Sequence, residues 1–233
     1  MNVSGFEITA VLFDLDNTLV DRDEAIRKLG QSLYALVKSS NKLLDQERFV
    51  DEFIRIDAGG SIPDKRDQMT TVAQELAIVG LDVDELHSWW NRMYPQVLSL
   101  ESSTLEVLNL LTNVGLPWGI VTNGSPLQMS VIAAVELGSI ATSVTVSSLV
   151  GLRKPDPAIF ELAMSQTAAN TPAEDFLFVG DNPTADIIGA AQIGMKTAWV
   201  SRGAKWPITD IGANIGPDIT IDSVGKLLGL TTT

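Results

Sequence analysis

A chain of 233 residues is long enough to bury a sizeable core, as one large domain or as one domain with a smaller module. Its 16 basic and 29 acidic residues leave a net charge of −13, which argues against nucleic acid and anionic membranes as partners and favours small molecules or proteins. The absence of cysteine excludes disulfides and thiolate chemistry. Without a secretion signal or an apolar run of membrane-spanning length, we expect a cytoplasmic protein, of open oligomeric state.

The first predicted element is a buried strand that ends in two aspartates. Residues 10–13 are all apolar, as is typical of a parallel strand, and Asp14 and Asp16 follow directly. Because such strands present ligands at their carboxyl ends, both side chains are expected at the mouth of a cleft. Two carboxylates this close keep both charges only if a cation or a shared proton relieves their repulsion. The pair therefore points to a divalent metal or to acid–base chemistry.

Residues 21–100 show helical periodicity and no convincing strand. Apolar residues recur at helical spacing in three stretches: Ile26, Leu29, Leu33, Leu36 and Val37; Met69, Val72, Leu76 and Val79; Leu86, Trp89, Trp90, Met93 and Val97. We interpret these stripes as the core of a small helical bundle inserted just past the first strand. Lys65 and Arg66 follow a loop-like stretch at 59–63, from which they could reach the cleft, or they are ordinary surface charges.

From residue 104 onward, predicted helices and strands alternate, which is typical of parallel βαβ units. Helices are expected near 105–111, 126–137, 157–166 and 185–193, and strands at 116–121, 143–146, 176–179, 197–200 and 219–221. The last three threonines, 231–233, are expected to be frayed. The fold class is therefore α/β, a doubly wound parallel sheet with a Rossmann-like core formed by residues 1–20 and 101–233, and a helical domain at 21–100.

Several polar residues follow the predicted strands and could converge on one edge of the sheet. Thr122 and Asn123 come after the second strand and Asp181 after a later one, while Lys154 lies in the loop before the helix at 157–166. Taken singly, each of these residues could be a helix cap, a turn former or a solvated charge.

Their joint order carries more information than any one of them. The motifs read Asp14-Leu-Asp16-Asn-Thr18, Thr122-Asn123-Gly124, Lys154-Pro155, and Gly180-Asp181 with Asp186 five residues on. In this order they closely resemble the four motifs of the haloacid dehalogenase-like hydrolase superfamily, in its phosphatase branch with a helical cap inserted after the first strand. The resemblance covers nearly the whole chain.

The resemblance implies a magnesium-dependent phosphomonoester hydrolase that acts on a small phosphorylated metabolite. Asp14 would be the nucleophile that forms an aspartyl-phosphate, and Asp16 the general acid and then base. Thr122, Asn123 and Lys154 would hold the phosphoryl oxygens. The ligands of Mg²⁺ would be the Asp14 side chain, the Asp16 backbone carbonyl and Asp181. Asp186 would lie outside this set and orient Lys154 or a metal-bound water.

Other functions stay open at this point. A metal-free dehalogenase is disfavoured because that branch typically lacks the second aspartate, here Asp16, and phosphonate cleavage would need a reactive cap lysine that nothing marks out. A phosphomutase also uses both aspartates. A phospho-accepting signalling receiver has a smaller fold without a helical insertion, and a binding or regulatory protein could keep the motifs without turnover. The sequence does not distinguish a nucleotide, a sugar phosphate or phosphoglycolate as substrate.

Overall fold

The computed structural model describes residues 1–38, 45–60, 64–207 and 216–232, and the chain folds as two compact units. The first, which we call the α/β unit, comprises Met1–Val20 and Ser99–Thr233. The second, the helical unit, comprises Asp21–Leu98. The chain thus leaves the helical unit at residue 98, where the sequence pattern placed the boundary at 100.

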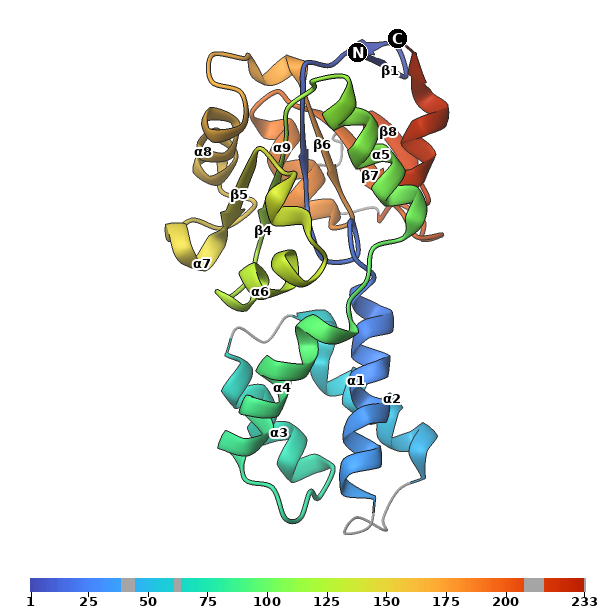
Figure 1. Cartoon of the computed structure of the whole chain (residues 1–233), viewed down its shortest axis with the longest axis vertical. Helices are drawn as coiled ribbons and strands as arrows, with labels where there is room; N and C mark the ends of the chain where they lie inside the picture. The colour runs from blue at the N-terminus through green and yellow to red at the C-terminus, as the bar shows by residue number, and fades with distance from the viewer. Residues whose placement is uncertain (39–44, 61–63, 208–215, 233) are drawn as a thin grey trace. The chain divides into compact units, whose positions relative to one another are not determined.

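The α/β unit is built on a parallel sheet that has six strands over the described residues (Figure 1). In spatial order these are β5 (Ser143–Val146), β4 (Trp118–Thr122), β3 (Ala10–Phe13), β6 (Phe176–Gly180), β7 (Lys196–Val200) and β8 (Ile219–Ile221). The winding direction reverses between β3 and β6, and this reversal confirms the predicted doubly wound sheet. In such sheets the ligand crevice lies at the carboxyl ends of the strands beside the reversal.

Each side of the sheet is covered by its own set of helices. The clearest are α5 (Ser102–Asn113) and the 3-10 helix η5 (Val224–Leu230), which pack together, and α8 (Pro157–Thr167) and α9 (Gly189–Gln192), which also pack together. Shorter helical segments connect the strands: α6 (Leu127–Ala134), η2 (Leu137–Ser139), α7 (Ser147–Val150), η3 (Ala173–Asp175) and the π-helix η4 (Pro183–Ile188). Among the described residues, none of the helices has both the length and the apolar character needed to cross a membrane.

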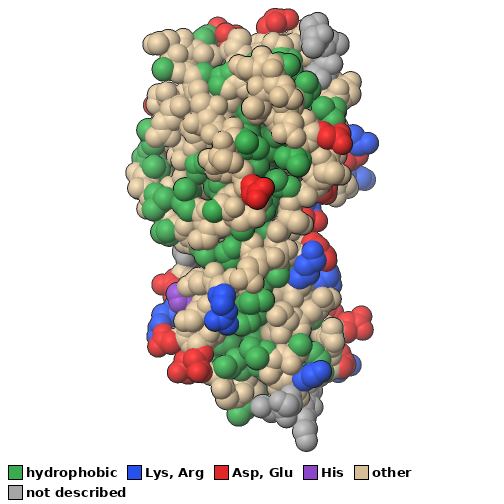
Figure 2. All heavy atoms as spheres, in the orientation of Figure 1, with side chains coloured by type: hydrophobic (Ala, Val, Ile, Leu, Met, Phe, Trp, Pro, Cys, Tyr) green, Lys and Arg blue, Asp and Glu red, His purple; other side chains and the backbone are tan. Residues whose placement is uncertain are grey.

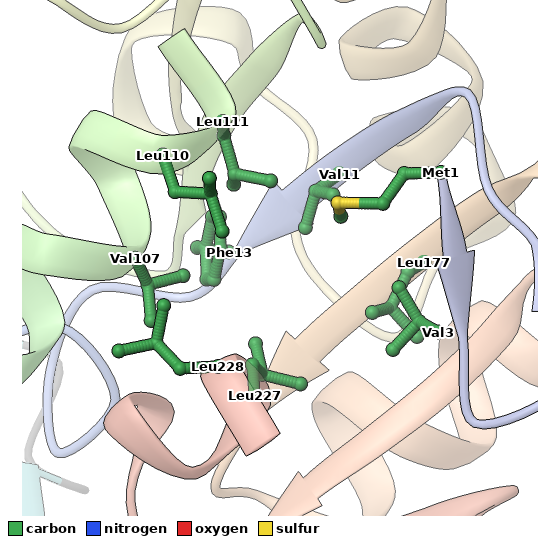
Figure 3. A pocket seen from close by; sticks show the side chains of 10 residues that line it. All are labelled: Met1, Val3, Val11, Phe13, Val107, Leu110, Leu111, Leu177, Leu227 and Leu228. Atoms are coloured by element: carbon green, nitrogen blue, oxygen red, sulfur yellow. The ribbon is translucent and has the colours of Figure 1, made fainter. Parts of the chain in front are cut away.

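The alternation of side chains along β3 explains which side of the sheet Asp14 faces. Ala10 and Leu12 belong to the buried cluster that α8 and α9 cover. Val11 and Phe13 instead line an apolar pocket beside α5 and η5 (Figure 3), together with Met1, Val3, Val107, Leu110, Leu111, Leu177, Leu227 and Leu228. Because side chains alternate in a strand, Asp14 follows Leu12 toward the α8–α9 side. The pocket in Figure 3 therefore lies on the opposite side of the sheet from the Asp14 side chain and contains none of the predicted site residues.

The helical unit is a bundle of α1 (Arg22–Val37), α2 (Gln46–Asp57), α3 (Lys65–Glu75) and α4 (Val83–Val97), with the 3-10 turn η1 (Ala58–Gly60) after α2 (Figure 1). An aspartate precedes each helix and accepts a hydrogen bond from a backbone N–H of its first turn: Asp21, Asp45, Asp64 and Asp82. These caps satisfy donors that have no partner within the helix, which explains why the helices begin where they do.

Two apolar residues of the predicted stripes are exposed, which corrects those assignments. Leu36 is 52% exposed because it lies at the edge of the stripe formed by its neighbours on α1. Val79 is 62% exposed because α3 ends at Glu75, so the helical spacing no longer applies. The sequence reading also missed α2 as a separate helix, although its buried side chains Phe49, Val50, Phe53 and Ile56 have helical spacing.

The chain ends form a small second sheet that the sequence did not predict. β1 (Asn2–Val3) pairs antiparallel with β2 (Phe6–Glu7) on one side and with β9 (Thr231–Thr232) on the other. The expectation that the terminal threonines are frayed is therefore wrong for Thr231 and Thr232, while Thr233 lies outside the described residues.

Candidate active site

The strands beside the reversal bring most of the predicted site residues to one edge of the sheet. Asp14 directly follows β3, Thr122 is the last residue of β4, and Asp181 directly follows β6. Lys154 comes from the loop before α8 and reaches the same place, since its Nζ lies 2.7 Å from Asp14 Oδ1. Residues more than a hundred positions apart in the chain thus meet at the expected ligand crevice.

Lys154 is the buried centre of this site, with only 3% of its surface exposed. Its ammonium donates to Asp14 Oδ1 at 2.7 Å and to the Val121 carbonyl at 2.8 Å, and it lies 2.7 Å from Asp186 Oδ1. Burial acts to lower the pKa of Lys154, but the charges of Asp14 and Asp186 outweigh it and hold the pKa above its ordinary value. Lys154 therefore stays charged and supplies fixed positive charge to the site.

Asn123 fixes the backbone from which Lys154 projects. The Asn123 side chain accepts a hydrogen bond from the Lys154 backbone N–H and donates one to the Lys154 carbonyl, both at 2.9 Å. Both ends of the amide are thus engaged. The side chain of Asn123 therefore positions Lys154. The substrate contact that the sequence predicted for Asn123 would then be made by the Asn123 backbone N–H.

Three carboxylates crowd around this one ammonium. Oxygen atoms of Asp14, Asp181 and Asp186 all lie within 4.8 Å of one another. Burial, together with the charges of Asp14 and Asp186, raises the pKa of Asp181 to about 8. Burial also raises the pKa of Asp186 to about 6, although the Lys154 charge acts in the opposite direction. The cluster holds more negative charge than its lysine can balance, a condition that a bound cation would relieve.

The donor set fits a hard divalent cation. All the available ligand atoms are oxygens, namely the three carboxylates and the backbone carbonyls of the turns, and Mg²⁺ is bound by one or two carboxylates with carbonyls and waters. The sequence predicted Asp14, Asp16 and Asp181 as ligands. The structure brings Asp186 equally close, but one of its oxygens faces Lys154.

Local backbone geometry explains how Asp186 turns back into the site. The π-helix η4 starts two residues after Asp181, and both the Asp186 and Ile187 N–H groups bond to the Asn182 carbonyl. The Asp186 Oδ2 atom in turn accepts from the Asn182 N–H at 2.9 Å. A Cβ on Gly180 would lie 2.4 Å from that same Oδ2 atom, so only glycine leaves room for this carboxylate. Single π-turns of this kind are rare and often occur at functional sites.

The turn after β3 presents Asp16. The N–H groups of Leu19 and Val20 both bond to the Leu15 carbonyl, and Asn17 adopts a left-handed conformation with φ of 60°. This tight turn holds Asp16, which is half-buried, one residue beyond the buried Leu15. The Asp16 Oδ2 atom accepts a hydrogen bond of 2.6 Å from Gln128 on α6, a residue that the sequence reading did not single out.

Trp199 is a second residue that the sequence reading missed. Its indole N–H donates to the Asp181 backbone carbonyl at 2.8 Å, and its ring packs edge-on against Trp206. No motif marked it, because a tryptophan in an apolar strand reads as ordinary core. The strand register of β6 and β7, which pairs Gly180 with Trp199, is what places the indole beside Asp181.

Lys65 and Arg66 are engaged within the helical unit itself. The Lys65 ammonium donates to Gln68 and lies 4.2 Å from the centre of the Trp90 ring, whereas Arg66 forms an exposed ion pair with Asp84. Residues 61–63 of the loop before them lie outside the described residues. On the face shown in Figure 2, the Lys and Arg side chains of this unit stand among Asp and Glu, without a patch of one sign.

The fold and this edge of the sheet together define an α/β enzyme with a cluster of acidic side chains at the carboxyl ends of its strands. A family model for haloacid dehalogenase-like hydrolases matches residues 8–194, and the chain belongs to that family.

Curated relatives of the chain are phosphatases. It is 26% identical over 232 residues to the glyceraldehyde 3-phosphate phosphatase of Pyrococcus furiosus, covering 95% of this chain and 92% of that protein. It is 30% identical over 227 residues to the N-acetylmuramic acid 6-phosphate phosphatase of Pseudomonas aeruginosa, covering 95% and 93%. Among solved structures, the magnesium-bound HAD-hydrolase YfnB of Bacillus subtilis matches with a TM-score of 0.77 at 22% identity, over 97% of this chain and all of that one.

Proposed function

We propose that the chain is a magnesium-dependent phosphomonoester hydrolase that acts on a small phosphorylated metabolite. In this proposal residues 1–20 and 101–233 are the catalytic domain, and residues 21–100 are a cap that shapes the choice of substrate. The observation that carries it is the buried contact of 2.7 Å between the Asp14 carboxylate and the Lys154 ammonium, at the point where the sheet reverses. The relatives support the substrate class, since their names specify small phosphorylated metabolites.

In the first half-reaction, an oxygen of Asp14 attacks phosphorus and the bond from phosphorus to the ester oxygen breaks. Asp16 gives its proton to the departing alkoxide, so that an alcohol leaves and Asp14 carries the phosphoryl group. The Asp14 backbone N–H, bonded to Val179 on β6 at 2.9 Å, holds the nucleophile at the end of its strand. A fixed nucleophile lowers the entropic cost of reaching the transition state.

In the second half-reaction, water attacks the phosphorus of the aspartyl-phosphate. Asp16, now ionised, takes the proton from that water, and cleavage of the bond to Asp14 releases inorganic phosphate. One carboxyl group thus acts first as acid and then as base. Splitting the displacement in this way replaces one difficult step with two easier ones.

Negative charge on the phosphoryl oxygens is balanced throughout by fixed groups of the site. Lys154 faces this charge from its buried position, and the Thr122 hydroxyl and the backbone N–H groups at Asn123 and Gly124 are the neutral donors. Asp14, the Asp16 carbonyl and Asp181 would hold a Mg²⁺ ion, which would supply further positive charge near the same oxygens. Asp186 keeps Lys154 in place through their 2.7 Å contact.

The test is hydrolysis of p-nitrophenyl phosphate with Mg²⁺ and then with a chelator. Turnover should require the metal and should be lost in Asp14→Asn, whereas Asp175→Asn, at the opposite end of β6, should keep it. Sustained turnover in Asp14→Asn would contradict the nucleophile assignment. A phosphomutase would instead interconvert sugar phosphates with little phosphate release, and a regulatory protein would keep label from a small phosphodonor without steady hydrolysis.

A further inference from the structure

Gln128 is a buried polar residue beside the site, and it belongs to none of the four family motifs. It lies in the first turn of α6 and is only 6% exposed. Its amide donates to Asp16 Oδ2 at 2.6 Å and lies 3.5 Å from the Thr122 hydroxyl. A single side chain therefore spans the proposed acid–base group and a proposed phosphate-binding group, which come from different strands.

The surroundings of Gln128 are shaped to hold it there. A Cβ on Gly124 would lie 2.5 Å from Gln128 Cγ and 2.9 Å from its Nε2 atom, so the glycine provides the space that the side chain fills. The Gln128 backbone N–H is fixed by the Ser125 carbonyl at 3.1 Å. Its Oε1 atom is buried without a protein partner among the described residues. A buried amide with an unused acceptor costs free energy, so packing alone does not explain a glutamine at this position.

We infer that Gln128 is a positioning residue that holds the Asp16 carboxyl group in the orientation needed for proton transfer to the leaving group. Asp16 stands on a tight turn and is half-buried, and its carboxyl group accepts the hydrogen bond of the Gln128 amide from α6. The hydrogen bond to one of its oxygens fixes the plane of the carboxyl group and thereby the direction of the other oxygen. Proton transfer requires a heavy-atom approach of about 2.6–3.2 Å, which tolerates little rotation. This role of Gln128 presupposes the proposed phosphatase chemistry.

The inference predicts a dependence on the leaving group that a purely structural role would not produce. Phenyl phosphate and p-nitrophenyl phosphate are nearly equal in size, but nitrophenolate departs readily without a proton and phenolate does not. A badly oriented Asp16 should therefore slow the cleavage of phenyl phosphate far more than that of p-nitrophenyl phosphate. The quantity to compare is kcat/KM, because it reports the steps up to formation of the aspartyl-phosphate and excludes its hydrolysis.

The experiment compares the wild-type protein with Gln128→Met, which keeps the length of the side chain and removes its hydrogen bonds. We expect kcat/KM for phenyl phosphate to fall roughly tenfold and that for p-nitrophenyl phosphate about twofold or less. The control is Gln166→Met on α8, which removes the hydrogen bond between Gln166 and Thr145 in the same unit and should change neither value. The affinity for Mg²⁺, measured by calorimetry, should be the same in all three proteins.

A second variant guards against misfolding of the first. Gln128→Leu also removes the hydrogen bond to Asp16 and should give the same unequal loss of kcat/KM for the two esters. If Gln128→Met and Gln128→Leu lower kcat/KM for both esters by the same factor, or for neither, the role of Gln128 is overturned while the proposed function stands. If the wild-type protein hydrolyses neither ester in the presence of Mg²⁺, the proposed function itself is overturned.

Discussion

Two buried charged clusters among the described residues differ in their balance of positive and negative charge. In the α/β unit, the carboxylates of Asp14, Asp181 and Asp186 share one lysine. In the helical unit, the single carboxylate of Asp57 accepts two hydrogen bonds from Arg22, at 2.7 and 2.9 Å. The first cluster is short of positive charge, and the second has it in excess.

The Asp57 cluster shows what a fully satisfied buried carboxylate looks like. Gln68 also donates to Asp57 at 3.1 Å, and the Lys65 ammonium lies 3.8 Å away. Burial acts to raise the pKa of Asp57, but the hydrogen bonds and charge of Arg22 outweigh it and leave the pKa below its ordinary value. By contrast, the pKa of Asp181 is raised to about 8. The carboxylate in the helical unit is thus balanced by groups of the protein, whereas the carboxylates in the α/β unit are crowded and could hold a metal ion.

The largest effect is expected from removing the lysine of the first cluster. Lys154→Met should lower kcat for p-nitrophenyl phosphate by about 10³–10⁵-fold, because it removes the buried cation that contacts Asp14 and balances the charge that spreads over the phosphoryl oxygens. Steady-state kinetics with Mg²⁺ measure this. Lys196→Met, on β7 of the same unit, is the matched control and should keep near-normal activity. A Lys154→Met variant with a tenth of the normal activity would show that the lysine is structural.

The second cluster should respond to the loss of its carboxylate in stability. Asp57→Asn should lower the free energy of unfolding by about 3–5 kcal/mol, because it removes the buried carboxylate charge that faces the buried guanidinium of Arg22 at 2.7 Å. Urea denaturation followed by circular dichroism measures the change. The matched control is Asp84→Asn, which breaks the exposed pair with Arg66 and should cost about 0–1 kcal/mol. Equal losses in the two variants would mean that burial of the pair adds nothing.

The sequence predicted the α/β unit well, because its residues carry local signals. Four apolar residues before Asp14 and four before Gly180-Asp181 identify buried strands, and parallel strands present their next residues at one edge. The position of Lys154 depended on the motif resemblance, since a lysine in a loop has no spacing that fixes its partner. The π-turn that returns Asp186 to the site has no sequence signature that we could read.

Contacts made across long stretches of chain explain most of what sequence analysis missed. Gln128 and Asp16 are 112 residues apart, and a single glutamine in a short helix has no pattern that relates it to an aspartate. The pairing of β1 with β9 joins the two ends of the chain through strands of two residues each, too short to show alternation. In the helical unit, the contact of Arg22 with Asp57 likewise depends on how α1 and α2 pack.

A smaller effect on the stability of the folded chain is expected from pH and magnesium, which act through the cluster of Asp14, Asp181 and Asp186. The pKa of Asp181 lies near 8 in the folded chain against an ordinary value of 3.8, so the folded chain binds more protons than the unfolded chain between these values. Without metal, stability should therefore fall as the pH rises from about 4 to about 8.

Magnesium should reverse this loss. At pH 8, Mg²⁺ at about 100 times its dissociation constant should raise Tm by about 5–10 °C, and by less at pH 5, where protons compete for the carboxylates. Differential scanning calorimetry at both pH values, with and without a chelator, measures the shift. Asp57, whose pKa is lowered, contributes stability that is lost only as the pH falls below about 4, so it does not mask the trend. An equal response to Mg²⁺ at both pH values would contradict the cation site.

The smallest expected effect is a change in stability whose sign differs between the two clusters. Asp181→Asn removes a carboxylate that is crowded by Asp14 and Asp186, so at pH 8 without metal the variant should be more stable than the wild-type protein by about 1 kcal/mol. At pH 5, where Asp181 is protonated in the wild-type protein, the two should be nearly equal. The variant should also lose both the stabilisation by Mg²⁺ and the metal-dependent turnover. Urea denaturation at the two pH values measures the free energy of unfolding. At pH 8, Asp181→Asn should raise it and Asp57→Asn, measured in parallel, should lower it. If the Asp181→Asn variant is less stable than the wild-type protein at pH 8, the charge of this carboxylate is already balanced by the protein, as that of Asp57 is, and a cation site here is contradicted.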